Sequence, residues 1–177
     1  MSSQDKVYVL EKLKKMQILQ ILEKYDPIFA GTIPIDIHTP ESDVDIICYA
    51  QNLEEFHNHL TDHFQGYDNF KIHQKAIKSK QSVVCSFDTE WFLIEIFGQN
   101  TPSRMQDAYK HMCVEERIIN LSPDPKLFRY KIRNMKLSGI KTEPAFGQYF
   151  NLKGCPYTRL LELEKLSDSD ILQTLKW

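Results

Sequence analysis

The chain has 177 residues, of which 42% are hydrophobic and 26% are charged, and its formal net charge is −2. This size and apolar fraction suit one compact domain with a buried core and exclude a disordered tail. The small net charge gives no global argument for a nucleic-acid or acidic-membrane partner. The apolar runs are too short to span a bilayer, the N-terminus lacks a signal-peptide pattern, and the four cysteines form no C-x-x-C pair. We therefore expect a cytoplasmic protein with no membrane partner.

The first half of the chain predicts helix, strand, loop, strand and helix in that order. Apolar residues at spacings of three and four predict an amphipathic helix, whereas alternation and β-branched residues predict a strand. The five elements occupy about residues 5–24, 27–31, 32–42, 43–49 and 53–64. Asn52, with Glu55 three positions later, resembles a capping box at the start of the last element.

The second half begins with strands and ends with helices. Two apolar runs, SVVCSF and WFLIEIF, flank DTE, which predicts a β-hairpin, and residues 71–78 before them alternate loosely. After Gly98 the apolar spacing is helical. We expect five helices there. The first follows Pro102, the second runs over 124–139 with Gly139 at its end, and the third starts at Glu143-Pro144 with Thr142 as its cap. The last two cover about 156–166 and 168–176.

Strands thus concentrate in residues 28–97, which predicts the α+β class. We expect a small mixed β-sheet with flanking helices and a C-terminal helical layer, or a small α/β core with the same layer. No repeat or long linker divides the chain, so we expect a single domain over residues 1–177. Its core would span about residues 26–100, with a helical tail packed on it over about 101–177. The oligomeric state is left open.

Two carboxylates, Asp43 and Asp45, open the apolar strand DVDIICY. Side chains alternate along a strand, so both carboxylates lie on one face, two strand steps or ~6.6 Å apart along the backbone. Their like charges repel, and a divalent cation between them removes that penalty. Hard oxygen ligands suit Mg²⁺ or Mn²⁺, which also bind substrate phosphates and water. The alternative interpretation is a solvated strand end.

Glu95 is the candidate for a third acid, because it is the only charge inside the apolar strand FLIEIF. Isolated charges are seldom placed in such runs without a partner or a metal. An edge position or a structural ion pair is the alternative for Glu95. Gly31-Thr32 ends the preceding strand, where a glycine lets the backbone approach a phosphate and the amide and hydroxyl donate hydrogen bonds to it.

The order of these features resembles that of the nucleotidyltransferase superfamily, which includes DNA polymerase beta-like and aminoglycoside-nucleotidylating enzymes. Its pattern is a Gly-Ser pair, a loop, Asp-x-Asp or Asp-x-Glu on a strand, and a third acid on a later strand. AGTIPIDIHTPESDVDII and LIEIF match this order, with Thr32 where serine is usual and Glu95 where aspartate is usual. The stretches GTIPI, SDVDIIC, IEIFGQ, AYKHM and KTEPAF also resemble a family of small, uncharacterised bacterial nucleotidyltransferase-like proteins.

The resemblance implies the transfer of a nucleoside monophosphate from a nucleoside triphosphate to a hydroxyl acceptor, with release of pyrophosphate. It implies that Asp43, Asp45 and Glu95 hold Mg²⁺ or Mn²⁺ and act in catalysis. The acceptor is open and includes a small molecule, an RNA end or a protein side chain. The alternative is a non-catalytic nucleotide-binding or protein-interaction domain that retains the fold.

The residues expected to bind the nucleotide lie in the loop and in the helical tail. They are Gly31, Thr32, Ser42, Arg129, Arg133 and Lys141. Arg129, Arg133 and Lys136 share one helix face, and Lys141 precedes a helix start, which favours anions. An ordinary solvent-exposed helix surface is the alternative for the face that carries Arg129.

The histidines are interpreted as structural. His57, His59 and His63 fall on one predicted helix, but no cysteine or acid completes a zinc set at a familiar spacing, so we expect exposed helix residues. His111 follows a helical stripe and is interpreted as a packed histidine, with orientation of a ligand as the alternative.

Overall fold

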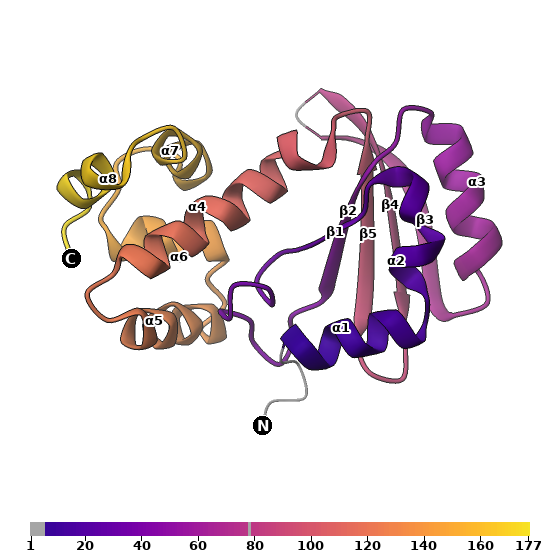
Figure 1. Cartoon of the computed structure of the whole chain (residues 1–177), viewed down its shortest axis with the longest axis horizontal. Helices are drawn as coiled ribbons and strands as arrows, with labels where there is room; N and C mark the ends of the chain where they lie inside the picture. Colours follow the sequence, from indigo (N-terminus) through magenta and orange to yellow (C-terminus); the bar gives the residue numbers. More distant parts are fainter. Residues whose placement is uncertain (1–5, 78) are drawn as a thin grey trace.

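A computed structural model describes residues 6–77 and 79–177, and a five-stranded mixed sheet lies at the centre of their N-terminal half (Figure 1). The strands are β1 (Ile28–Ala30), β2 (Val44–Tyr49), β3 (Asp68–Ile77), β4 (Lys80–Asp88) and β5 (Leu93–Gln99). Their order is β1-β2-β5-β4-β3, in which β2 and β5 are parallel and the other neighbours are antiparallel. The predicted mixed sheet and the β4–β5 hairpin are confirmed.

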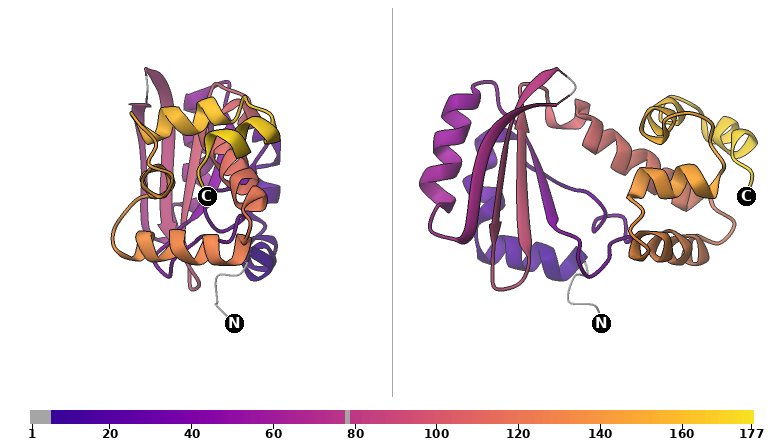
Figure 2. Two further views of the ribbon diagram at one scale, coloured as in Figure 1. Left: turned by 90° about the vertical axis from the view of Figure 1, so that its left-hand side faces the viewer. Right: turned by 180° about the vertical axis from the view of Figure 1, so that it is seen from behind.

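Helices cover one face of the sheet and extend from the other. The N-terminal helices are α1 (Lys6–Lys15), α2 (Ile18–Ile21) and α3 (Leu53–Phe64), and the later ones are α4 (Asp107–Leu121), α5 (Pro125–Leu137), α6 (Thr142–Tyr149), α7 (Pro156–Leu163) and α8 (Asp168–Thr174). Short 3₁₀ turns occupy Glu23–Tyr25 and Ser103–Met105. Helix α4 leads away from the sheet to a group formed by α5–α8 (Figures 1 and 2). In the described part of the chain no helix is both long and apolar enough to cross a membrane.

The expected helix over residues 5–24 is not continuous; residue 5 lies outside the described residues, and the rest is interrupted at Gln17. Gln17 has a left-handed backbone with φ 56°. The break has a packing reason, because Val9, Leu13 and Ile18 are all fully buried. A straight helix would turn Ile18 away from the face that carries the other two.

The predicted cap of α3 is confirmed, whereas the predicted cap of α6 is wrong. The Asn52 side chain accepts hydrogen bonds from the backbone N–H groups of Glu54 and Glu55, as expected of a cap. The Glu55 carboxylate accepts a hydrogen bond from Lys24 (2.9 Å). Helix α6 begins at Thr142 itself, so the expectation that Thr142 is the cap is wrong by one residue.

The two faces of β2 follow the predicted alternation. Val44, Ile46 and Cys48 are buried in a hydrophobic cluster between the sheet and the helices α1–α3. Asp45 therefore points to the opposite face of the sheet, toward α4. The same alternation on β5 buries Ile94 and directs Glu95 to that face.

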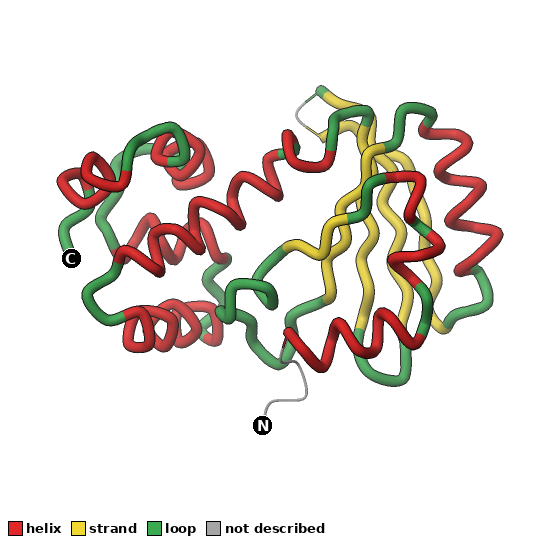
Figure 3. The backbone as a smooth tube through the Cα atoms, in the orientation of Figure 1, coloured by secondary structure: helices red, strands yellow, loops and turns green. Residues whose placement is uncertain are grey.

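The segment over residues 32–42 is irregular, as predicted, but it is anchored at several points (Figure 3). Ile33 packs in the cluster of the sheet, whereas Ile35 and Ile37 pack in a second cluster among the helices α4–α8. The guanidinium group of Arg129 donates to the Ile35 carbonyl oxygen (3.2 Å). These contacts hold the loop between the two clusters and so fix the position at which Gly31 leaves β1.

Candidate functional site

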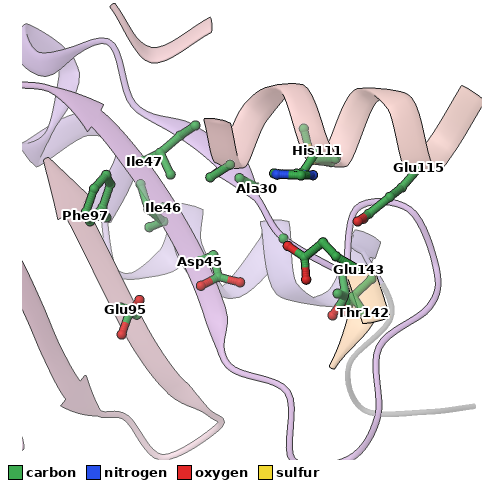
Figure 4. A pocket seen from close by; sticks show the side chains of 14 residues that line it. Ala30, Asp45, Ile46, Ile47, Glu95, Phe97, His111, Glu115, Thr142 and Glu143 are labelled. Carbon is green, nitrogen blue, oxygen red and sulfur yellow. The ribbon is translucent and has the colours of Figure 1, made fainter. Parts of the chain in front are cut away.

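A cavity of about 320 Å³ lies between the helix α4 and the face of β2 and β5 that carries Asp45 and Glu95 (Figure 4). Gly31 and Thr32, at the end of β1, line it together with Asp45 and Glu95. The opposite wall comes from α4 and from the start of α6. Two of the three predicted acids, Asp45 and Glu95, therefore meet the predicted glycine corner, Gly31-Thr32, at one cavity. Asp43 does not line this cavity.

Asp45 and Glu95 are direct partners in the register of the parallel strands β2 and β5. Neighbouring strands lie about 4.8 Å apart, so the two carboxylates leave the sheet side by side. Burial, and then the charges of Asp43 and Glu95, raise the pKa of Asp45 to about 8, against the opposing effect of Lys136. Burial, followed by the charge of Asp43, also raises the pKa of Glu95. Asp43, one residue before β2, thus acts on both acids.

This donor set fits one or two divalent cations. Asp43, Asp45 and Glu95 supply hard oxygen ligands, and the raised pKa values of Asp45 and Glu95 reflect burial and repulsion that a cation would relieve. In sites with two such ions, the ions lie about 3.5–4 Å apart.

Gly31 is required by its contact with Asp45. Its backbone has φ +79°, and a Cβ atom added there would lie 2.1 Å from Oδ2 of Asp45. Beside it, the Thr32 hydroxyl lies 3.5 Å from the Ser42 hydroxyl, which accepts a hydrogen bond from the Thr39 backbone N–H (2.9 Å). Only glycine lets the backbone lie directly against the Asp45 carboxylate.

The basic residues of α5 divide into two groups. Arg129 and Arg133 face the loop: Arg133 donates to the Asp36 carbonyl (2.5 Å) and pairs with the Asp36 carboxylate. Burial lowers the pKa of Lys136, an effect opposed mainly by Glu115 and then by Asp45. Lys136 is thus the α5 cation whose charge acts on the acids of the cavity. Lys141 is exposed and immediately precedes α6.

The family described as "Domain of unknown function (DUF4269)" matches residues 11–163 of the sequence. The chain belongs to this DUF4269 family. No curated protein sequence matches it.

Solved structures show which fold this DUF4269 member has. It is similar to the Cid1 poly(U) polymerase bound to MgGTP, with a TM-score of 0.55 and 12% identity over 90% of this chain and 49% of that one. It is also similar to a cytoplasmic RNA terminal U-transferase, with a TM-score of 0.54 and 12% identity over 90% of this chain and 47% of that one. The Cid1 polymerase bound to Mg 3′-dATP gives a TM-score of 0.54 and 14% identity, over 88% and 48%. The fold is therefore that of nucleotidyltransferases, and the chain spans about half the length of these proteins.

The far wall of the cavity contains two acids that the sequence-based prediction missed. Glu115 lies one helical turn after His111 on α4, and Glu143 lies in the first turn of α6. The available signal was the spacing of His111 and Glu115, because residues four apart share one face of a helix. His111 is buried, as predicted, and its ring meets that of Tyr157 edge-on at 6.0 Å.

The three histidines of α3 lie on another part of the molecule. His63 is exposed, as predicted, whereas His57 and His59 are half-buried, so the prediction that they are exposed is wrong. Nε2 of His59 lies 2.9 Å from the carbonyl oxygen of Ile21, which explains why it packs against α2.

Without bound metal, the free energy of unfolding of this protein is expected to fall as the pH rises from about 4 to about 8. The folded-state pKa of Asp45, about 8, lies above its ordinary value of 3.8, so the folded state binds this proton more tightly. The stabilisation is complete below the unfolded-state pKa and is lost as the pH rises through the folded-state pKa. The slope from this one group is at most about 1.4 kcal/mol per pH unit. Urea unfolding in the presence of a chelator, at several pH values, measures it.

Asp45→Asn is the matched control for this titration, because asparagine keeps the shape and removes the proton. The variant should lack this part of the slope, so its free energy of unfolding exceeds that of the wild type increasingly toward pH 8. Parallel profiles for the two proteins would show that Asp45 does not hold its proton in the folded state.

Proposed function

We propose that this protein is a metal-dependent nucleotidyltransferase that moves a nucleoside monophosphate from a nucleoside triphosphate to a hydroxyl acceptor. The observation that carries the proposal is the pairing of Asp45 with Glu95 at the cavity, directly beside Gly31. The nucleotidyltransferase fold supports it. The Cid1 structures include complexes with MgGTP and with Mg 3′-dATP, which favours a triphosphate as the ligand here. The implied origin of the family in bacteria and the cytoplasmic location stay predictions.

The acids have separate roles in this proposal. Asp43, Asp45 and Glu95 would hold Mg²⁺ or Mn²⁺, which would neutralise charge on the attacking and leaving oxygens. Glu95, whose pKa is raised, is suited to accept the proton of the acceptor hydroxyl. The acceptor oxygen then forms a bond to the α-phosphorus as the bond from that phosphorus to the bridging oxygen of the β-phosphate breaks. Pyrophosphate leaves with the electron pair of that bond.

The triphosphate would lie along the glycine corner. The backbone at Gly31 and the hydroxyl of Thr32 are the proposed donors to phosphate oxygens. The Thr32 hydroxyl donates to the Ser42 hydroxyl (3.5 Å), so it would exchange this acceptor for a phosphate oxygen. Lys136 adds positive charge near the acids, and Lys141 precedes the N-terminus of α6.

Arg129 and Arg133 are engaged with the loop over residues 32–42, through Ile35 and Asp36. Their proposed contribution to nucleotide binding therefore acts through the position of that loop.

Incubation with labelled triphosphates and a cell extract tests the proposal. We expect an extract component to gain the label from at least one triphosphate in the presence of Mg²⁺ or Mn²⁺. Digestion of the product with nuclease or protease distinguishes an RNA end, a protein or a small molecule as the acceptor. Asp43→Asn with Asp45→Asn should abolish the label, whereas Asp62→Asn, an exposed carboxylate on α3, should leave it unchanged.

Thermal unfolding separates binding from transfer. A triphosphate with Mg²⁺ at about 100 times its Kd stabilises by about 2.7 kcal/mol, which corresponds to a rise of about 5–10 °C in Tm for a chain of this size. Stabilisation without any labelled product would favour the non-catalytic nucleotide-binding alternative. The absence of both would favour the protein-interaction alternative.

A further inference from the structure

An imidazole and two carboxylates meet on the wall of the cavity that faces Asp45 and Glu95. His111 and Glu115 come from α4, and Glu143 comes from the first turn of α6 (Figure 4). One ligand atom from each lies within 4.8 Å of the other two. The cluster is built from two helices, and neither Asp45 nor Glu95 belongs to it.

The carboxylate of Glu115 gives an independent reason to expect a ligand. Its side chain is only 4% exposed, it lines the cavity, and its Oε1 atom has no hydrogen-bond partner among the described residues. A buried carboxylate oxygen without a donor is costly, and its charge is further disfavoured by Glu143 nearby. A bound cation would satisfy both carboxylates at once.

We propose that His111, Glu115 and Glu143 form a Zn²⁺ site that is separate from the site of the strand acids. An imidazole and two carboxylates are ordinary zinc ligands, with bonds of about 2.0–2.2 Å. At the tetrahedral angle, two ligands at such distances lie about 3.3–3.6 Å apart, so atoms within 4.8 Å of one another would have to close by at most about 1.5 Å. The imidazole favours zinc over Mg²⁺, which prefers oxygen ligands alone.

The proposed ion would keep an open coordination position. Three protein ligands leave the fourth tetrahedral position for water or substrate, as in catalytic zinc sites. His111 and Glu143 also line a second cavity of about 280 Å³, which extends toward Tyr157 and Lys80. The ion would therefore lie between two cavities, of which one is lined by Asp45 and Glu95 and the other by Tyr157.

Titration of the purified protein with Zn²⁺ alone, without nucleotide, tests the proposal. Calorimetry is expected to give one tightly bound ion per chain, apart from any weaker binding at Asp43, Asp45 and Glu95, and Co²⁺ in its place should show the visible absorption of a tetrahedral site. Glu115→Gln and Glu143→Gln should each weaken Zn²⁺ binding at least tenfold. Both are isosteric, and both remove repulsion between the two acids, so they should keep or increase resistance to urea.

Two controls assign the bound ion. His63→Ala should leave the affinity unchanged, because its ring belongs to the exposed end of α3. Asp43→Asn with Asp45→Asn should retain one bound Zn²⁺ while losing stabilisation by Mg²⁺ and a triphosphate, so failure of either site is distinguishable from failure of the other. Equal Zn²⁺ affinity in wild type, Glu115→Gln and Glu143→Gln, or loss of binding in His63→Ala, would overturn the proposal.

Discussion

Replacement of Glu95 by glutamine is expected to lower the rate of nucleotide transfer by about 10²–10⁴-fold, the usual range for loss of a general base. Glutamine keeps the shape of the side chain on β5 but cannot accept the proton of the acceptor hydroxyl. The triphosphate should still bind, because Asp43 and Asp45 and the glycine corner at Gly31 are unchanged. Single-turnover transfer of label, compared with the triphosphate-dependent rise in Tm, measures the two effects separately.

The structure gives this variant a matched control and a check on folding. Glu90→Gln makes the same chemical change in the turn between β4 and β5, where the side chain is exposed, and should transfer label at the wild-type rate. Removing the charge of Glu95 also removes repulsion on Asp45, so the metal-free variant should be at least as resistant to urea as the wild type. A Glu95→Gln protein that is folded, binds triphosphate and transfers label at the wild-type rate would exclude Glu95 as the base.

The strand part of the site could be predicted because it depends on local pattern. Alternation along β2 places Asp45 opposite to Val44 and Ile46, and the sheet follows this alternation. Alternation along a single strand cannot predict that Asp45 pairs directly with Glu95. This pairing depends on the register of two strands about fifty residues apart in the sequence, and a shift by one residue would turn Glu95 to the other face.

The rest of the site depends on contacts between distant parts of the chain. Glu115 and Glu143 belong to different helices, and only the packing of α4 and α6 places them together. The prolines of the loop correctly predict irregular backbone, but its polar residues conceal that Ile33, Ile35 and Ile37 are all buried. Such a loop resembles a solvent-exposed turn in sequence, because burial of its isoleucines requires the two clusters on either side.

The glycine corner, Gly31-Thr32, depends both on local sequence pattern and on contacts between distant parts of the chain. Gly31 is recognisable in the sequence as a strand end, but its function comes from where the anchored loop directs the backbone. Ile35 and Asp36, bound by Arg129 and Arg133, hold the loop on α5. The chain must therefore leave β1 sharply, and it passes directly against Asp45.

Gly31→Ala is accordingly expected to be strongly destabilising and to abolish triphosphate binding. The left-handed backbone with φ +79° costs a non-glycine residue about 1–2 kcal/mol. The new Cβ atom would also lie 2.1 Å from Oδ2 of Asp45, so the carboxylate or the strand must move. We expect a total loss of about 3 kcal/mol or more in the free energy of unfolding, in the range of other severe substitutions. Urea unfolding and the Mg²⁺-triphosphate shift in Tm measure the two effects.

Gly139→Ala separates backbone strain from the contact with Asp45. Gly139 lies just after the C-cap of α5 with φ +86°, but a Cβ atom there would meet nothing within 4 Å. That variant should therefore lose only the backbone contribution, about 1–2 kcal/mol, and keep its triphosphate response. Gly66→Ala, also in open space, should change little. If Gly31→Ala is no more destabilising than Gly139→Ala and still binds triphosphate, then the close approach of the backbone to Asp45 is not what requires glycine at this corner.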